Sequence, residues 1–151
     1  MAARLALLDA GLKKDGKLVV HPEERVGIVC ANAYGSLEAI TELNRVAKLE
    51  DPRYINPAVF PNTVANSTAG YVSIWEGLRA LNVAISDGNC GALDAVACAD
   101  IHLAQNRADA MLVGGISFGS GEEGLGEDAG PLAVAGEALH QADVEHLVGL
   151  V

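Results

Sequence analysis

The chain has 151 residues, half of them hydrophobic and 4% aromatic, and a formal net charge of −10. This length suits one compact domain over residues 1–151, and the composition is too apolar for a disordered chain. The acidic balance disfavours nucleic acid and anionic membranes as partners, and no apolar run approaches the roughly 20 residues that span a bilayer. The amino terminus lacks a signal-peptide layout, which predicts a cytoplasmic protein.

Helical and strand patterns alternate along the first half of the chain. In chain order they predict a helix over residues 2–11, a turn at 15–16, a buried parallel strand at 26–31, a helix over 36–49 and a Pro-rich break from 51 to 61. Gly11 is a good residue for the carboxyl-terminal cap of the first helix, and Ser36 for the amino-terminal cap of the second.

The second half continues the alternation. It predicts a helix over residues 66–78, a buried strand at 83–86, an Ala-rich helix over 90–106, a strand at 110–116, a Gly- and acid-rich loop at 117–128, a fourth strand at 132–135 and a short helix over 137–146. Strands that alternate with helices predict an α/β fold, with a mostly parallel mixed sheet and helices packed on it.

The cysteines and histidines form no metal-binding pattern. The odd number of cysteines fits neither a disulfide framework nor a CxxC site, and a reducing compartment is expected; they are Cys30, Cys90 and Cys98. We therefore assign no metal and no cofactor. The only basic cluster, expected to be solvated loop charge, comprises Lys13, Lys14 and Lys17.

Several short segments occur in an order and spacing typical of one family. They are RVGIVCANAYGSLEA at 25–39, FPNTVANSTAGYVSIWEGLRALNVAIS at 60–86, ADAMLVGGI at 108–116 and LGEDAGPLAV at 125–134. Together they resemble the amino-terminal half of a β-ketoacyl synthase, a thiolase-fold enzyme that joins acyl units in fatty-acid and polyketide synthesis. The resemblance implies a thiolase-like half-fold.

The resemblance also identifies a functional turn. In that family a cysteine nucleophile follows the strand that corresponds to residues 83–86. Counting back from Gly114–Gly115 by the family's usual spacing places Asn89 at the nucleophile position. Polyketide chain-length factors, the inactive partners of condensing synthases, also lack this cysteine. Gly88 and Gly91 are implied to shape the turn that binds the carbonyl oxyanion.

Cys90 is the alternative nucleophile. A condensation needs an activated thiolate on a turn at a helix amino terminus, where the dipole and free N–H groups favour it. Cys90 lies one position late, which rotates its side chain by about 100°. It serves as the nucleophile if the alignment allows a one-residue gap; otherwise it is a small, partly buried helix residue. His102 lies twelve residues further on, roughly 18 Å along a helix, too far to act as its base.

Tyr71 and Trp75 are four residues apart on a predicted helix. Such a pair is expected on one packed helical face. The resemblance offers a second interpretation, in which the two rings form the wall of an acyl or aryl pocket at a dimer interface.

Two parts of the family pattern have no counterpart in this sequence: the first strand and the whole carboxy-terminal half, which in the family supplies two catalytic histidines and a lysine. We therefore expect a non-condensing, chain-length-factor-like subunit that pairs, as a homo- or heterodimer, with a complete synthase through the strand at 83–86. Acyl carrier protein is a weaker candidate partner, because an acidic surface suits docking of an acidic protein poorly. The alternatives are an active acyltransferase that uses Cys90 with a partner's histidines, and an oligomeric scaffold or binding domain without catalysis.

Overall fold

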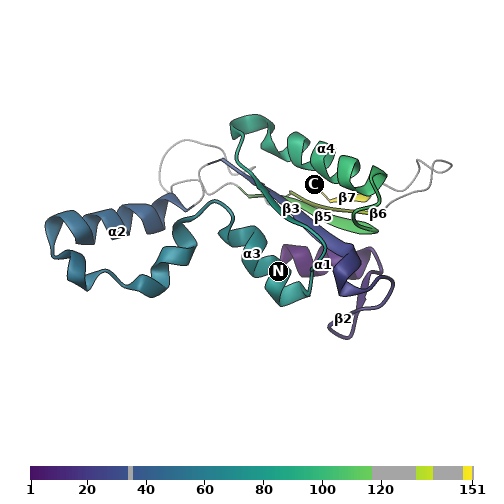
Figure 1. Ribbon diagram of the computed structural model, residues 1–151, viewed down its shortest axis with the longest axis horizontal. Coiled ribbons are helices and arrows are strands. Elements are labelled where there is room, and N and C mark those ends of the chain that lie inside the picture. Colours follow the sequence, from purple (N-terminus) through teal and green to yellow (C-terminus); the bar gives the residue numbers. More distant parts are fainter. Residues whose placement is uncertain (34–35, 117–131, 138–147, 151) are drawn as a thin grey trace.

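The computed structural model describes residues 1–33, 36–116, 132–137 and 148–150. Its centre is a five-stranded sheet with the strand order β4-β3-β5-β6-β7 (Figure 1). The strands are β3 (Val26–Asn32), β4 (Asn82–Ile85), β5 (Ala110–Ile116), β6 (Leu132–Glu137) and β7 (Val148–Leu150). Strand β3 pairs in parallel with β4 and β5, whereas β6 is antiparallel to β5 and β7 to β6. The predicted α/β fold with a mixed sheet is confirmed.

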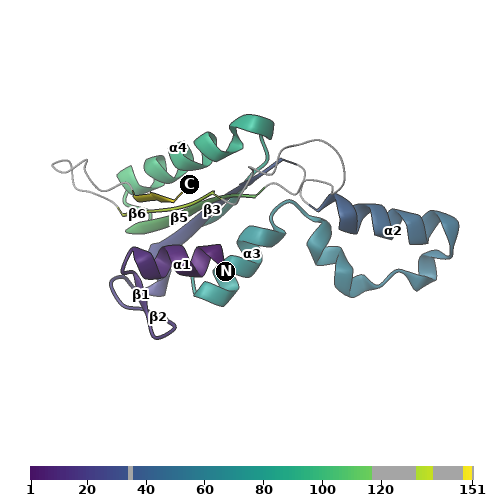
Figure 2. The same cartoon turned by 180° about the vertical axis from the view of Figure 1, so that it is seen from behind.

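Helices cover both faces of this sheet. Helices α1 (Ala2–Asp9) and α3 (Ser67–Glu76) lie on one face and α4 (Gly91–Ala104) on the other (Figures 1 and 2). Every residue of β3 is buried, as expected for a central parallel strand with covered faces. Because successive side chains of a strand point to opposite faces, Ile28 joins the core under α1 while Val29 joins the core under α4.

A segment between β3 and α3 extends away from these layers (Figure 1). It consists of α2 (Leu37–Leu49) and the 3-10 helices η2 (Pro52–Tyr54) and η3 (Pro57–Thr63), and we call residues 37–63 the arm. The predicted cap of α2 is confirmed, since the Ala39 N–H donates to Ser36 Oγ at 3.4 Å. The arm nevertheless contains no buried residue, because α2 packs mainly on η2 and η3 rather than on the sheet.

The structure corrects the prediction that the strand at 83–86 is buried. The short apolar run at 83–86 indicated a buried strand, but β4 spans Asn82–Ile85 at the edge of the sheet and its residues are exposed or half-buried. A run of four apolar residues is compatible with either position, because only tertiary pairing determines how many neighbours a strand has.

The structure also corrects the prediction that all three lysines of the basic cluster are solvated. Asp15 and Gly16 do form a turn, with positive φ at both residues, but it closes a hairpin of β1 (Lys13–Lys14) and β2 (Lys17–Leu18) that the sequence analysis missed. Lys13 is only 5% exposed, and its Nζ lies 2.5 Å from Glu76 Oε2 at the end of α3. Two of the cluster's lysines remain exposed, Lys14 and Lys17.

Of the elements predicted near the carboxyl end, the strand lies within the described residues. The strand predicted at 132–135 is found as β6, which continues to Glu137. The predicted loop at 117–128 and helix over 137–146 otherwise lie outside the described residues. Strand β7 was not predicted.

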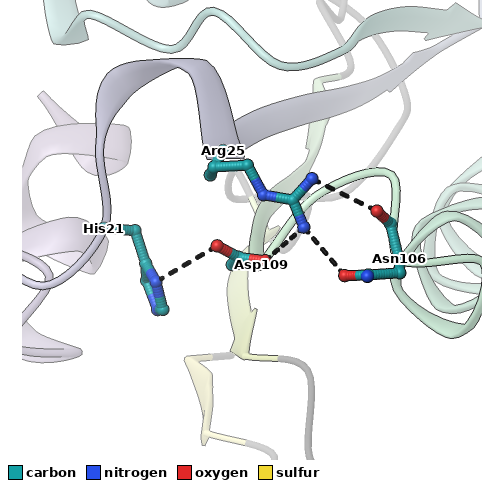
Figure 3. Close-up of polar contacts among 4 residues, drawn as sticks. All are labelled: His21, Arg25, Asn106 and Asp109. Atoms are coloured by element: carbon teal, nitrogen blue, oxygen red, sulfur yellow. Dashed lines mark hydrogen bonds and ion pairs between the residues drawn. The ribbon is translucent and has the colours of Figure 1, made fainter.

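A polar network joins the amino-terminal ends of β3 and β5 (Figure 3). The Arg25 guanidinium donates to Asp109 Oδ1 and, at 2.8 Å, to Asn106 Oδ1. His21 Nδ1 lies 3.6 Å from Asp109 Oδ2. The hydrogen bond from Arg25 holds the pKa of Asp109 below its ordinary value. This network fixes the two strands at the end of the sheet opposite the turn described below.

Gly27 offers a test of the packing between β3 and its neighbours. A Cβ there would lie 2.7 Å from Met111 Sδ and 3.0 Å from the Leu81 carbonyl oxygen. We expect Gly27→Ala to lower the free energy of unfolding by about 1–3 kcal/mol, measured by urea denaturation, because the Leu81 backbone cannot move aside cheaply.

Gly70 provides the matched control. It lies within α3, and a Cβ there would meet nothing within 4 Å. Gly70→Ala should leave the stability unchanged or raise it by up to about 1 kcal/mol, because alanine is the better helix former. Equal effects of the two substitutions would contradict the close packing at Gly27.

Candidate functional site

The turn that joins β4 to α4 lies at the carboxyl end of the three parallel strands. Ligands bind at this end in open α/β sheets. The turn contains the 3-10 helix η4 (Gly88–Cys90), with Asn89 at its centre. Gly88 has a φ of +45°, in the left-handed region that favours glycine. Glycine at position 88 therefore allows the chain to bend at this point of the turn.

Small residues bring the start of α4 against the sheet. Gly91 is buried, and a Cβ there would lie 3.4 Å from the Cβ of Ala31 on β3. A Cβ on Gly115 of β5 would lie 3.6 Å from the Cβ of Ala92. The amino-terminal N–H groups of α4, which have no intrahelical acceptors, are consequently held at the edge where parallel strands end. The implied turn role of Gly88 and Gly91 is consistent with this geometry.

Cys90 is the amino-terminal cap residue of α4, and its side chain is exposed. The expectation of a partly buried residue is therefore wrong: the cap position precedes the first helical turn, so α4 does not cover it. The backbone N–H of Cys90 donates to the Asp87 carbonyl at 3.2 Å. Cys30 is buried, which raises its thiol pKa, and Cys98 is half-buried against the core under α4.

Two carboxylates flank Cys90. Asp94, in the first turn of α4, shares a hydrogen bond with Asp87, and this bond raises the pKa of Asp94; burial and repulsion from Asp87 add to the shift. Asp94 lies four residues after Cys90, which places it on the same side of the helix. This pair was not predicted from the sequence, although two aspartates placed three residues before and four residues after the cysteine were a usable signal.

Neither described histidine serves Cys90 as a base. His102 lies in the last turn of α4, where its Nδ1 is 3.2 Å from the Arg107 guanidinium. His21 belongs to the network at the opposite end of the sheet. The remaining two, His140 and His146, lie outside the described residues. Within the described ranges, no group of three or more potential ligands forms a metal site, and no helix is long and apolar enough to cross a membrane.

Tyr71 and Trp75 stack on each other, with ring centroids 5.5 Å apart and an angle of 23° between the planes. Trp75 and the adjacent Ile74 are about three-quarters exposed. The two rings pack on each other but are exposed, so the expected packed face is not covered by the described residues of this chain; the interpretation as a pocket wall at a dimer interface stays a prediction.

A cleft of about 470 Å³ lies between the arm, the end of β3 and the start of α3. Tyr71 is one of its walls, whereas Trp75 is not. Its lining includes the carboxylates of Glu38 and Glu42, together with amide and hydroxyl groups. The structure thus places Tyr71 at a cleft with many polar lining residues but a mostly apolar surface, apart from the turn that carries Asn89 and Cys90.

Comparison with known proteins identifies the family. Residues 1–127 match the model of the β-ketoacyl synthase N-terminal domain. The chain belongs to the β-ketoacyl synthase family. It is 33% identical over 114 residues to 3-oxoacyl-[acyl-carrier-protein] synthase 2 of Vibrio cholerae, which covers 74% of this chain and 28% of that protein. It is 28% identical over 123 residues to the putative polyketide β-ketoacyl synthase 1 of Streptomyces virginiae, covering 76% of this chain and 29% of that protein.

Solved structures agree with this assignment. The ishigamide ketosynthase/chain length factor superposes with a TM-score of 0.62 at 28% identity, covering 78% of this chain and 34% of that one. A β-ketoacyl synthase from Burkholderia phymatum has a TM-score of 0.66 at 22% identity, covering 79% and 29%, and supports the fold. The chain spans just over a quarter of the length of these curated β-ketoacyl synthases.

The carboxylate pair on the turn gives a pH-dependent prediction. A raised pKa means that the fold favours protonated Asp94, so this stabilisation is present at low pH and is lost as the pH rises through the raised pKa. We expect Asp87→Asn to lower the pKa of Asp94, because the substitution removes a negative charge and supplies an amide donor. Carbon-13 NMR titration of the Asp94 carboxyl measures the shift.

Asp100→Asn is the control, since Asp100 is exposed and six residues further along α4. It should leave the Asp94 titration midpoint where it is. If Asp87→Asn also leaves that midpoint unchanged, the two carboxyls do not interact.

Proposed function

We propose that this chain is a non-condensing β-ketoacyl-synthase subunit of fatty-acid or polyketide biosynthesis that acts together with a complete synthase, in the manner of a chain-length factor. The observation that carries the proposal is the turn before α4. Its glycines lie at a bend and at a close contact beside a helix amino terminus, and the family's spacing assigns Asn89 to the nucleophile position.

The chemistry of Asn89 supports this proposal. A condensing synthase first holds the acyl group as a thioester, which requires a thiolate nucleophile. A carboxamide is not a nucleophile for thioesters. The first N–H groups of α4 have no intrahelical acceptors, so this helix start can still donate hydrogen bonds to a bound group.

The edge of the sheet supports pairing with another subunit. Strand β4 has one neighbour, β3, within the described residues, so its other side presents unpaired backbone groups that can extend a sheet across two subunits. Helix α3 lies beside β4, since Asn82 Nδ2 donates to the Ala69 carbonyl at 3.1 Å. Helix α3 also presents exposed apolar residues, and we propose that they contact the partner. They are Tyr71, Ile74 and Trp75.

One observation favours a second function. Cys90 is exposed and occupies the amino-terminal cap position of α4, so its thiol is accessible to an acyl donor. In this alternative Cys90 carries the acyl group and the partner supplies the histidines.

Acyl transfer distinguishes the two functions. We expect no acyl adduct on Cys90 when the chain is incubated with a long-chain acyl thioester, alone or with a complete synthase, because neither described histidine of this chain lies on the turn to activate the thiol. Peptide mass spectrometry is the measurement. Iodoacetamide serves as the accessibility control and should label exposed Cys90 faster than buried Cys30. A thioester on Cys90 would establish the alternative.

The partner surface can be tested with two matched substitutions. Ile74 on α3 and Leu93 on α4 are both 76% exposed, and their helices cover opposite faces of the sheet. Ile74→Ala should weaken binding to a complete synthase at least about five-fold, as expected for a buried aliphatic contact. Leu93→Ala should leave the dissociation constant unchanged. Equal Kd values for both variants and the unaltered chain, measured by calorimetry, would refute the proposed surface.

A further inference from the structure

The arm depends little on apolar packing against the rest of the chain. None of the residues in α2, η2 or η3 is buried, while every residue of β3 is. Segments with few buried apolar contacts open at a lower free energy than the core to which they are attached. Contacts other than apolar burial must therefore hold the arm in its position.

Polar contacts hold the base of the arm. Asn32, the last residue of β3, is 9% exposed, and its Nδ2 donates to the Ala65 carbonyl at 2.6 Å. This bond joins the strand that leads into the arm to the segment that leads out of it. On α3, the Tyr71 hydroxyl lies 3.1 Å from Asn62 Oδ1 in η3, which ties the returning side of the arm to the layers.

The same contacts surround the cleft. Asn32, Ala65 and Tyr71 line it from the sheet side, and Ala39 and Val59 line it from the arm. The cleft is therefore bounded on one side by the arm and on the other by the end of β3 and the start of α3, and these hydrogen bonds hold the two sides together. A change in the angle of the arm changes the width of the cleft.

The base of the arm is also connected to the turn before α4. Ser86 follows β4 directly, and its hydroxyl donates to the Ala33 carbonyl at 3.1 Å. Ala33 follows Asn32 at the outgoing root of the arm. Ser86 thus links the root of the arm to the segment that carries Gly88 and Cys90.

We propose that the arm opens by local unfolding as one cooperative unit, that Asn32 and Tyr71 are the latch that holds it closed, and that this latch controls access to the cleft. The proposal concerns this chain alone and does not depend on the function proposed above. Asn32 and Tyr71 are positioning residues in this account, because each acts by holding the arm.

Hydrogen exchange of the full chain tests the latch. We expect Asn32→Ala and Tyr71→Phe each to speed amide exchange in α2 roughly three- to ten-fold, the effect of losing one neutral hydrogen bond. Exchange in β3 and β5 should not change. Tyr71→Phe keeps the ring that stacks on Trp75, so it decides the question if Asn32→Ala does not fold. Tyr54→Phe removes a hydroxyl from an exposed tyrosine of the arm and should match the unaltered chain.

A second readout measures access to the cleft. The thiol introduced by Ala39→Cys should react with a charged thiol reagent faster when combined with Tyr71→Phe than when combined with Tyr54→Phe. Unchanged α2 exchange in both latch variants would overturn the latch. Exchange that rises equally in α2 and in β3 and β5 would show that the arm does not open separately, and would overturn the proposal as well.

Discussion

The close contact between the start of α4 and strands β3 and β5 determines the rest of the site. Gly91 sits against Ala31, and Ala92 sits close to Gly115, so the helix begins directly on the ends of the strands. Larger side chains at these positions would push the helix away and remove its N–H groups from the sheet edge. The turn at Gly88 follows from this constraint, because the chain must reverse within a few residues between β4 and α4.

The sequence predicted the central elements well because their signals are local. The apolar runs of β3 and β5 and the alanine-rich pattern of α4 appear in the structure within two residues of the expected ends. The failures concern features that depend on tertiary contacts. The exposure of β4 depends on which strands pair, and the burial of Lys13 depends on Glu76, which is distant in the sequence.

The candidate site also combines features that the sequence indicated with features that depend on tertiary contacts. The family resemblance identified the turn, and the structure puts Gly88 at a bend and Gly91 at a close contact, while their role in binding an oxyanion stays a prediction. The exposure of Cys90 and the position of Tyr71 at the cleft were not predictable, because each depends on parts of the chain that meet only after folding. Within the described residues, the edge strand β4 has one neighbour and the arm has no buried residue, and these observations support the proposal that the chain acts together with another subunit.

The product profile of a complete synthase, measured by mass spectrometry with and without this chain, tests whether the chain is a non-condensing subunit. We expect that the chain alone forms no β-ketoacyl product and that its addition shifts the length distribution of the synthase's products. An unchanged distribution, with no complex between the two proteins, would contradict the account, as would condensation by this chain in the absence of the synthase.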